Sequence, residues 1–86
     1  MTKMEIFEVG DRVVFNVKSV SYLYGKIGTV VAIEPESGSN IVYFDDDVSG
    51  LEFKEFGVPF KHGFSVSAND IKLAKSRLGV SSKRVD

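Results

Sequence analysis

The chain contains no cysteine, and this absence removes a whole group of folds and chemistries. Without thiols there are no disulfides, no thiolate nucleophile and no zinc knuckle. Histidine occurs once, at His62, so a cluster of histidine ligands is excluded as well. The sequence also lacks a Gly-x-Ser-x-Gly elbow, a P-loop and a His-Glu-x-x-His motif. We therefore expect a protein that is not an enzyme and that uses no cofactor and no metal.

Long apolar runs are missing too. No uninterrupted apolar stretch exceeds four residues, whereas a membrane span requires about 18. Residues 1–10 have neither a basic start nor an apolar centre, which are the marks of a signal peptide. We expect a cytoplasmic protein that does not contact a membrane.

The length and composition favour one small globular domain. The chain has 86 residues, of which 43% are apolar and 27% charged, and small domains fold with as few as about 60 residues. We assign residues 1–75 to a single domain and residues 76–86 to a flexible basic tail, because the end of the chain is polar and broken by glycine.

The formal net charge of −1 conceals a gradient along the chain. Residues 44–70 are strongly acidic, whereas residues 71–86 are strongly basic. Nucleic-acid-binding proteins usually carry a basic face on the folded body, since affinity comes largely from displaced phosphate counterions. The acidic body therefore argues against phosphate binding there, although not in the tail.

Five short β-rich segments and no amphipathic helix predict an all-β fold. The predicted strands are residues 12–17, 27–33, 41–45, 62–67 and 71–74, with a 3₁₀ turn over 67–70. Gly28, inside the second strand, is expected to mark a bend or bulge. Residues 18–26 and 46–61 are predicted to be long loops. Closing five strands into a small barrel would remove exposed edges, so we predict a five-stranded barrel with a long loop before strand four.

Two stretches resemble known families. The pattern VGDRVVF…YGKIGTVVAI, with Gly25, Gly28, Val30 and Ile33, resembles SH3-like barrels of the KOW kind. The continuation NIVYFDDDVSG…KHGFSVSANDIKLA is similar to small SH3-like proteins encoded by bacteriophages and prophages. Together they cover about residues 8–74. The resemblance implies a non-enzymatic protein-binding module, a monomer or weak homodimer in the host cytoplasm, that binds a host or phage protein. Such a protein would modulate or inhibit host transcription or defence machinery.

The candidate partner-binding residues fall in three segments. Exposed tyrosines supply large, rigid contact area with a polar tip, and we expect one of the two tyrosines to be exposed and the other to plug the barrel end. Acidic side chains can meet a basic surface on a partner. The phenylalanines of the long loop either cover the barrel end or present an apolar patch to a partner or a second copy. The candidates are Tyr22, Leu23, Tyr24, Asp46, Asp47, Phe53 and Phe56, with Phe60 beside them.

Two further features have a chemical and a structural interpretation. Asp45, Asp46 and Asp47 could bind a divalent ion, but consecutive acids diverge at a strand end, so we favour a turn cap by Asp45 or Asp47. His62 could act as a general base, but no partner group is evident, so we favour a structural histidine bonded to a loop carbonyl.

The alternative function is an RNA- or DNA-binding domain of the KOW type. It would use basic side chains on the first long loop and in the tail. These residues are Lys18, Lys26, Lys75, Arg77, Lys83 and Arg84.

Overall fold

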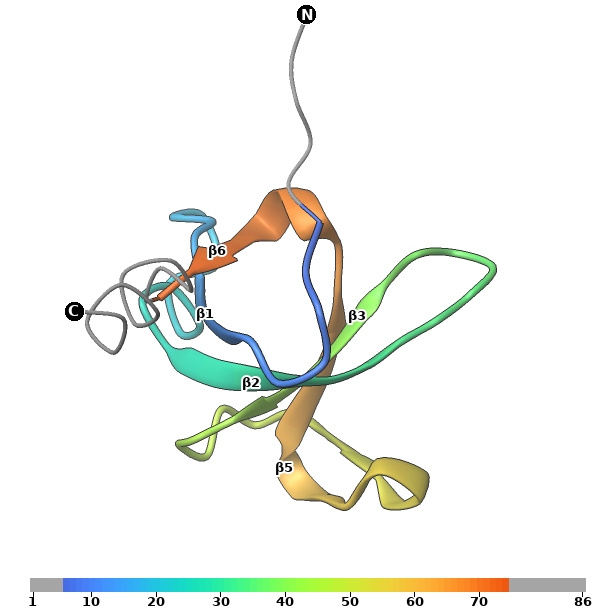
Figure 1. Ribbon diagram of the computed structural model, residues 1–86. Helices are drawn as coiled ribbons and strands as arrows, with labels where there is room; N and C mark the ends of the chain where they lie inside the picture. Colours follow the sequence, from blue (N-terminus) through green and yellow to red (C-terminus); the bar gives the residue numbers. More distant parts are fainter. Residues whose placement is uncertain (1–5, 75–86) are drawn as a thin grey trace, which may run out of the picture.

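Six short strands form one antiparallel sheet in the computed structural model, which describes residues 6–74 (Figure 1). The order across the sheet is β4-β5-β3-β2-β1-β6. Two single 3₁₀ turns, η1 and η2, stand before β5 and β6. The elements are β1 Arg12–Phe15, β2 Ile27–Ile33, β3 Asn40–Phe44, β4 Leu51–Phe53, η1 Lys54–Phe56, β5 Val58–Val66, η2 Ala68–Asp70 and β6 Ile71–Leu73.

The all-β prediction is confirmed, but the predicted number of strands and the closure of the sheet are not. There are six strands, and within residues 6–74 the terminal strands β4 and β6 do not pair with each other. The sheet curls instead, so that β5 runs across the molecule from η2 to the β4–β5 hairpin (Figure 1). The second strand and the last 3₁₀ turn fall where the sequence predicted them.

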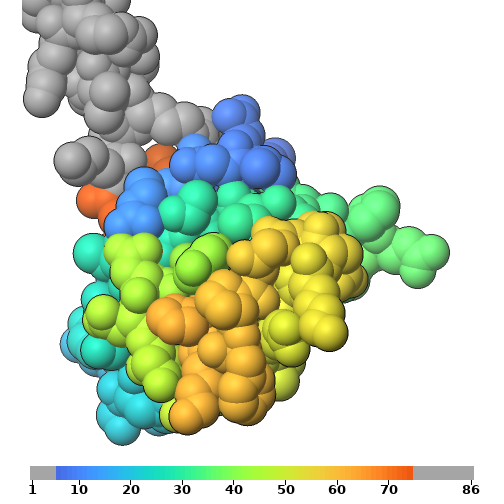
Figure 2. Space-filling model, turned by 90° about the horizontal axis from the view of Figure 1, so that it is seen from below, coloured from blue at the N-terminus to red at the C-terminus, as the bar shows by residue number. Residues whose placement is uncertain are grey.

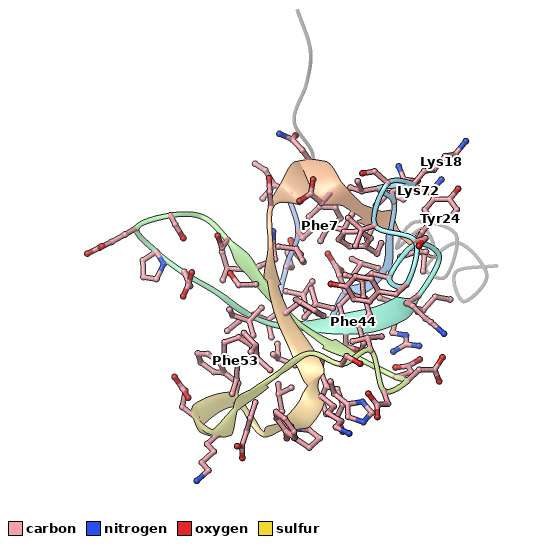
Figure 3. All side chains as sticks on the ribbon, turned by 180° about the vertical axis from the view of Figure 1, so that it is seen from behind. Phe7, Lys18, Tyr24, Phe44, Phe53 and Lys72 are labelled. Atoms are coloured by element: carbon pink, nitrogen blue, oxygen red, sulfur yellow. The ribbon has the colours of Figure 1, made fainter. Side chains whose placement is uncertain are left out.

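The hydrophobic core fills the concave side of this curled sheet. Alternate residues of the strands point into it, as a pleated strand with one buried face requires. Phe44 is fully buried, and its ring meets that of Phe64 edge to face at 6.2 Å. Phe7, from the segment before β1, is buried in the same cluster (Figure 3). Ile41 and Val58 are buried outside this cluster, so β3 and β5 bury side chains away from the concave core as well.

Residues 46–61 were predicted to be a loop, and this is wrong for most of them. The segment contains β4, η1 and the beginning of β5, which together form a hairpin. Gly57 adopts a left-handed conformation, with φ of 74°, and reverses the chain. A Cβ atom on Gly63 would lie 2.6 Å from Phe53 Cδ2 and 2.8 Å from Val58 Cγ1. The missing side chain of Gly63 therefore makes the room in which the hairpin packs.

Gly28 does not mark a bulge. It pairs regularly with Phe44, and the register shift of the β2–β3 pair lies between Val30 and Ala32. A Cβ atom on Gly28 would lie 2.6 Å from the Tyr43 carbonyl oxygen. Glycine is required here because the neighbouring backbone approaches closely.

The chain ends are outside this description. The predicted tail over residues 76–86 lies outside the described residues, as do the side chains of Lys75, Arg77, Lys83 and Arg84. Within residues 6–74, no helix has the length and apolar character needed to cross a membrane.

Candidate interaction surfaces

The loop between β1 and β2 is held in place by its own backbone. The Val20 carbonyl accepts hydrogen bonds from the Leu23 and Tyr24 amides at 3.0 and 2.9 Å. The Gly25 amide donates to the Phe15 carbonyl at 2.9 Å, which joins the end of the loop to β1. These bonds close the loop into consecutive tight turns and fix the path of its backbone.

Tyr22 and Tyr24 are both exposed, at 58% and 43%, whereas Leu23 between them is 3% exposed. Leu23 belongs to the main core cluster. The prediction that one tyrosine is buried is wrong, because Leu23 fills the core position that a tyrosine was expected to fill. Leu23 is also corrected as a contact residue, since a buried side chain offers no surface to a partner.

Charged side chains lie on this loop and on the strand beside it. Lys18, Lys72 and Tyr24 lie at the same end of the molecule (Figure 3), and Lys72 pairs with Val14 on the strand that leads into the loop. Lys26 Nζ lies 3.4 Å from Asp46 Oδ2, which brings the predicted acidic residue to the loop. We name this region the loop surface and define it as Lys18, Tyr22, Tyr24, Lys26, Asp46 and Lys72.

The three consecutive aspartates have three different structural roles. Asp45 accepts two hydrogen bonds from the Arg12 guanidinium, which also donates to Thr29 Oγ1 at 2.8 Å. These hydrogen bonds lower the pKa of Asp45 and raise that of Arg12. Asp47 Oδ1 accepts from the Ser49 amide at 2.9 Å, which confirms the predicted turn cap. Residues 6–74 contain no group of three or more histidine, cysteine or acidic side chains placed to hold a metal ion.

The predicted phenylalanines Phe53 and Phe56 lie on β4 and η1, away from the loop surface. Phe53 is half-buried and its ring centroid is 6.4 Å from that of Phe56, which is exposed on η1. Phe53 and Tyr24 are at opposite sides of the molecule (Figure 3). The predicted contact residues therefore separate into the loop surface and a second group on the β4–β5 hairpin.

His62 has the predicted structural role, with one difference. Its Nδ1 atom is 2.8 Å from the Phe44 carbonyl oxygen, and its ring meets Tyr43 edge-on at 5.7 Å. The carbonyl belongs to the end of β3 rather than to a loop. The half-buried imidazole thus joins two neighbouring strands.

Sequence reasoning missed two residues that contribute to these surfaces. Lys72 was counted with the basic end of the chain, and only its pairing with Val14 assigns it to the loop surface. Leu51, which is 55% exposed on the same strand as Phe53, was missed because β4 has three residues, too few for a strand period to be recognised. The alternation Leu51-Glu52-Phe53 was the one available signal.

Comparison with known proteins adds no relative. No protein-family model matches the chain, and no match was found to a curated protein or to a solved structure.

Proposed function

We propose that this protein is a non-enzymatic module that binds another protein through the loop surface, on a sheet of the SH3-like type. Three features support the fold proposal. β1 and β6, at the two ends of the described chain, pair side by side. β2, β3 and β5 follow in order, and a 3₁₀ turn precedes β6. On this interpretation the β4–η1 segment is an addition between the third and fourth strands of the barrel.

The observation that carries the functional proposal is the exposed, buried, exposed order of Tyr22, Leu23 and Tyr24. Leu23 fixes the loop to the core, and backbone hydrogen bonds fix its turns. Binding is weakened by the cost of ordering side chains and loops at the interface. A loop that is already ordered avoids part of that cost, so its tyrosines are suited to act as anchors in a partner's pocket.

The loop surface carries three lysines and one aspartate, so its charge suits an acidic protein surface as well as a polyanion. Both signs occur there, because Lys26 and Asp46 lie within ion-pair distance. Mixed charges can steer and orient a complementary protein surface. The phage-type identity of the chain, and the host protein as its partner, stay predictions.

The test is capture of a partner from lysate, followed by a binding titration with the purified partner. Replacing Tyr22 and Tyr24 together by alanine should weaken the affinity at least about tenfold, as the loss of aromatic anchors does. The exposed Ile33, at the far end of β2, provides the control, and Ile33→Ala should bind like the wild type. Equal binding by the tyrosine variant would reject the loop surface.

A control for folding separates contact from stability. Leu23→Ala should lower the free energy of unfolding by about 2–5 kcal/mol because it leaves a cavity in the core. The two tyrosine substitutions should leave the unfolding midpoint nearly unchanged, since both side chains are exposed.

Binding of single-stranded nucleic acid is the second candidate function, and the shared position of Lys18, Lys72 and Tyr24 favours it (Figure 3). Lysines can contact phosphates while an exposed aromatic ring stacks on a base. Such a complex should weaken steeply as salt rises, in proportion to the phosphates neutralised. Absence of a complex with single- or double-stranded oligonucleotides at low salt would exclude this candidate.

A further inference from the structure

The side of the sheet that faces away from the core extends the loop surface. Val14 pairs with Ile27 on one side and with Lys72 on the other. Directly paired residues of antiparallel strands carry their side chains on the same face, so these three form a row across β6, β1 and β2. Val13 and Phe15 alternate with Val14 and belong to the core cluster, which places the row on the outer face. We name Val14, Ile27 and Lys72 the outer row.

The outer row adds apolar surface next to the tyrosines of the loop. Ile27 is 40% exposed at the start of β2, and Val14 beside it is half-buried. Tyr24, three residues before Ile27, is 43% exposed. Lys72 faces the same way as Ile27 and lies at the same end of the molecule as Tyr24 (Figure 3). Aromatic, aliphatic and basic groups are therefore available together to one partner.

The lysines of the loop surface differ in whether their charge is offset. Lys26 Nζ lies 3.4 Å from Asp46 Oδ2, so this lysine already has a counter-charge. Lys18 and Lys72 are exposed, and within residues 6–74 neither forms an ion pair. Both lie near Tyr24 (Figure 3). Two positive charges without a partner in the described chain therefore stand beside the exposed apolar groups.

The body that carries these two lysines is acidic. Residues 6–74 contain six basic and ten acidic side chains, a net charge of −4. A nucleic acid has a phosphate at every nucleotide, so a strand bound across Lys18 and Lys72 would also bring phosphates to Asp46 and to the acidic body. A protein can instead place acidic groups opposite the two lysines and neutral groups elsewhere, which is how complementary interfaces avoid like-charge contacts.

We propose that the loop surface and the outer row together bind an acidic segment of a protein partner, one whose carboxylates flank an apolar side chain. The carboxylates meet Lys18 and Lys72, and the apolar side chain meets Tyr24 and Ile27. This inference rests on the proposed function and adds the chemistry of the partner. The charges would set the specificity and the rate of association, and the apolar groups would supply contact area.

The first experiment selects binders to the full chain from a random library of twelve-residue peptides displayed on yeast. Peptides that bind the wild type should be enriched in aspartate and glutamate next to an apolar residue. A variant with Lys18→Glu and Lys72→Glu should lose this enrichment, because carboxylates would then face like charges. Selected peptides that are not acidic, or acidic enrichment that survives in this variant, would overturn the proposal.

The matched control reverses two lysines elsewhere. Lys54→Glu with Lys61→Glu changes the net charge by the same amount, and within residues 6–74 these exposed side chains also form no ion pair. Figure 2 shows the β1–β2 loop, in cyan, and the β4–η1 segment that contains Lys54, in yellow, at opposite sides of β5, in orange. The control should select the same acidic peptides as the wild type. Circular dichroism and thermal melting establish that both variants are folded.

The second experiment measures affinity by fluorescence anisotropy with one selected peptide and with a twelve-residue oligothymidylate. The peptide should bind the variant with Lys18→Glu and Lys72→Glu at least about tenfold more weakly than the wild type, since like charges are then opposed. Ile27→Ala should also weaken the peptide complex. The oligothymidylate should bind the wild type more weakly than the peptide does at the same salt concentration. Equal or tighter binding of the oligothymidylate, lost in the lysine variant, would assign this surface to nucleic acid and overturn the proposal.

A tyrosine variant distinguishes failure of this inference from failure of the proposed function. If Tyr22→Ala with Tyr24→Ala abolishes peptide binding and the two lysine reversals do not, the loop surface is retained and the acidic partner is rejected. If the peptides bind both variants as they bind the wild type, the loop surface itself is rejected.

Discussion

Arg12 is a side chain that forms hydrogen bonds across the sheet. It stands on β1, donates to Thr29 on β2, and holds Asp45 at the end of β3. One guanidinium therefore joins three strands, which the planar, multiply donating group of arginine is suited to do. Since both charged side chains are about half exposed, solvent weakens their attraction.

The Arg12–Asp45 pair predicts a small dependence of stability on pH. The hydrogen bonds from Arg12 lower the pKa of Asp45 in the folded state. The pair therefore stabilises the fold fully above the ordinary aspartate pKa, and this contribution is lost as the pH falls through the lower folded-state value. Asp45→Asn should cost about 0.2–1 kcal/mol near neutral pH. Urea denaturation at a series of pH values should show the difference from the wild type shrinking in acid.

High salt provides the control for this prediction, because it screens exposed charges. The effect of Asp45→Asn should be smaller at high ionic strength. A difference that is the same in acid as at neutral pH would show that the charge of Asp45 does not contribute.

At the scale of elements, glycines determine how closely neighbouring segments approach, and Gly28 and Gly63 are two of them. Gly28 accommodates the Tyr43 carbonyl, and Gly63 accommodates Phe53 and Val58. Neither Gly28 nor Gly63 is among the glycines with a positive φ, so neither is required for a left-handed backbone. Both glycines are required for space.

Gly28→Ala should lower the free energy of unfolding by about 1–3 kcal/mol or more, as overpacking in a filled interior does. The added methyl group would meet the Tyr43 backbone, which cannot rotate away as a flexible side chain can. Chemical denaturation measures the loss, with Ile33→Ala at the exposed end of the same strand as the control. Equal stability of Gly28→Ala and the wild type would mean that β2 and β3 separate without cost.

The sequence predicted elements well where the pattern was local. β2 was predicted with its observed limits because five of its seven residues are β-branched and a turn with proline, glycine and serine follows it. β4 was missed because its three residues are too few to show a pattern. Phe53 of this strand packs where Gly63 has no side chain, and Gly63 lies ten residues beyond the end of β4. That condition involves distant residues, and a local pattern does not contain it. The same holds for Leu23, whose burial depends on where the loop meets the core.

For the whole molecule, closure of the core depends on more than the strands. The segment before β1 passes along the curled sheet and delivers Phe7 into the core (Figures 1 and 3). Because the terminal strands β4 and β6 do not pair within the described chain, side chains from outside the sheet must exclude water from its open side. Phe7 is one of them.

Phe7→Ala should therefore cost about 3–5 kcal/mol, like truncation of a phenylalanine in a core strand. Phe44→Ala, at the centre of the core, should fall in the same range. The exposed Val9 is the control, and Val9→Ala should change stability little. Urea denaturation of the three variants makes the comparison. A Phe7 variant as stable as the Val9 variant would show that the segment before β1 does not seal the core.

The order of Tyr22, Leu23 and Tyr24 has a consequence for how such a protein can change over generations. Substitutions at positions 22 and 24 alter the exposed surface, which under the proposed function contacts a partner, and leave the packing of the core unchanged. Substitution at position 23 alters the packing of the core and leaves the exposed surface unchanged. Under the proposed function, selection for a new target and selection for a stable fold would therefore act on different codons, and recognition could change without loss of stability.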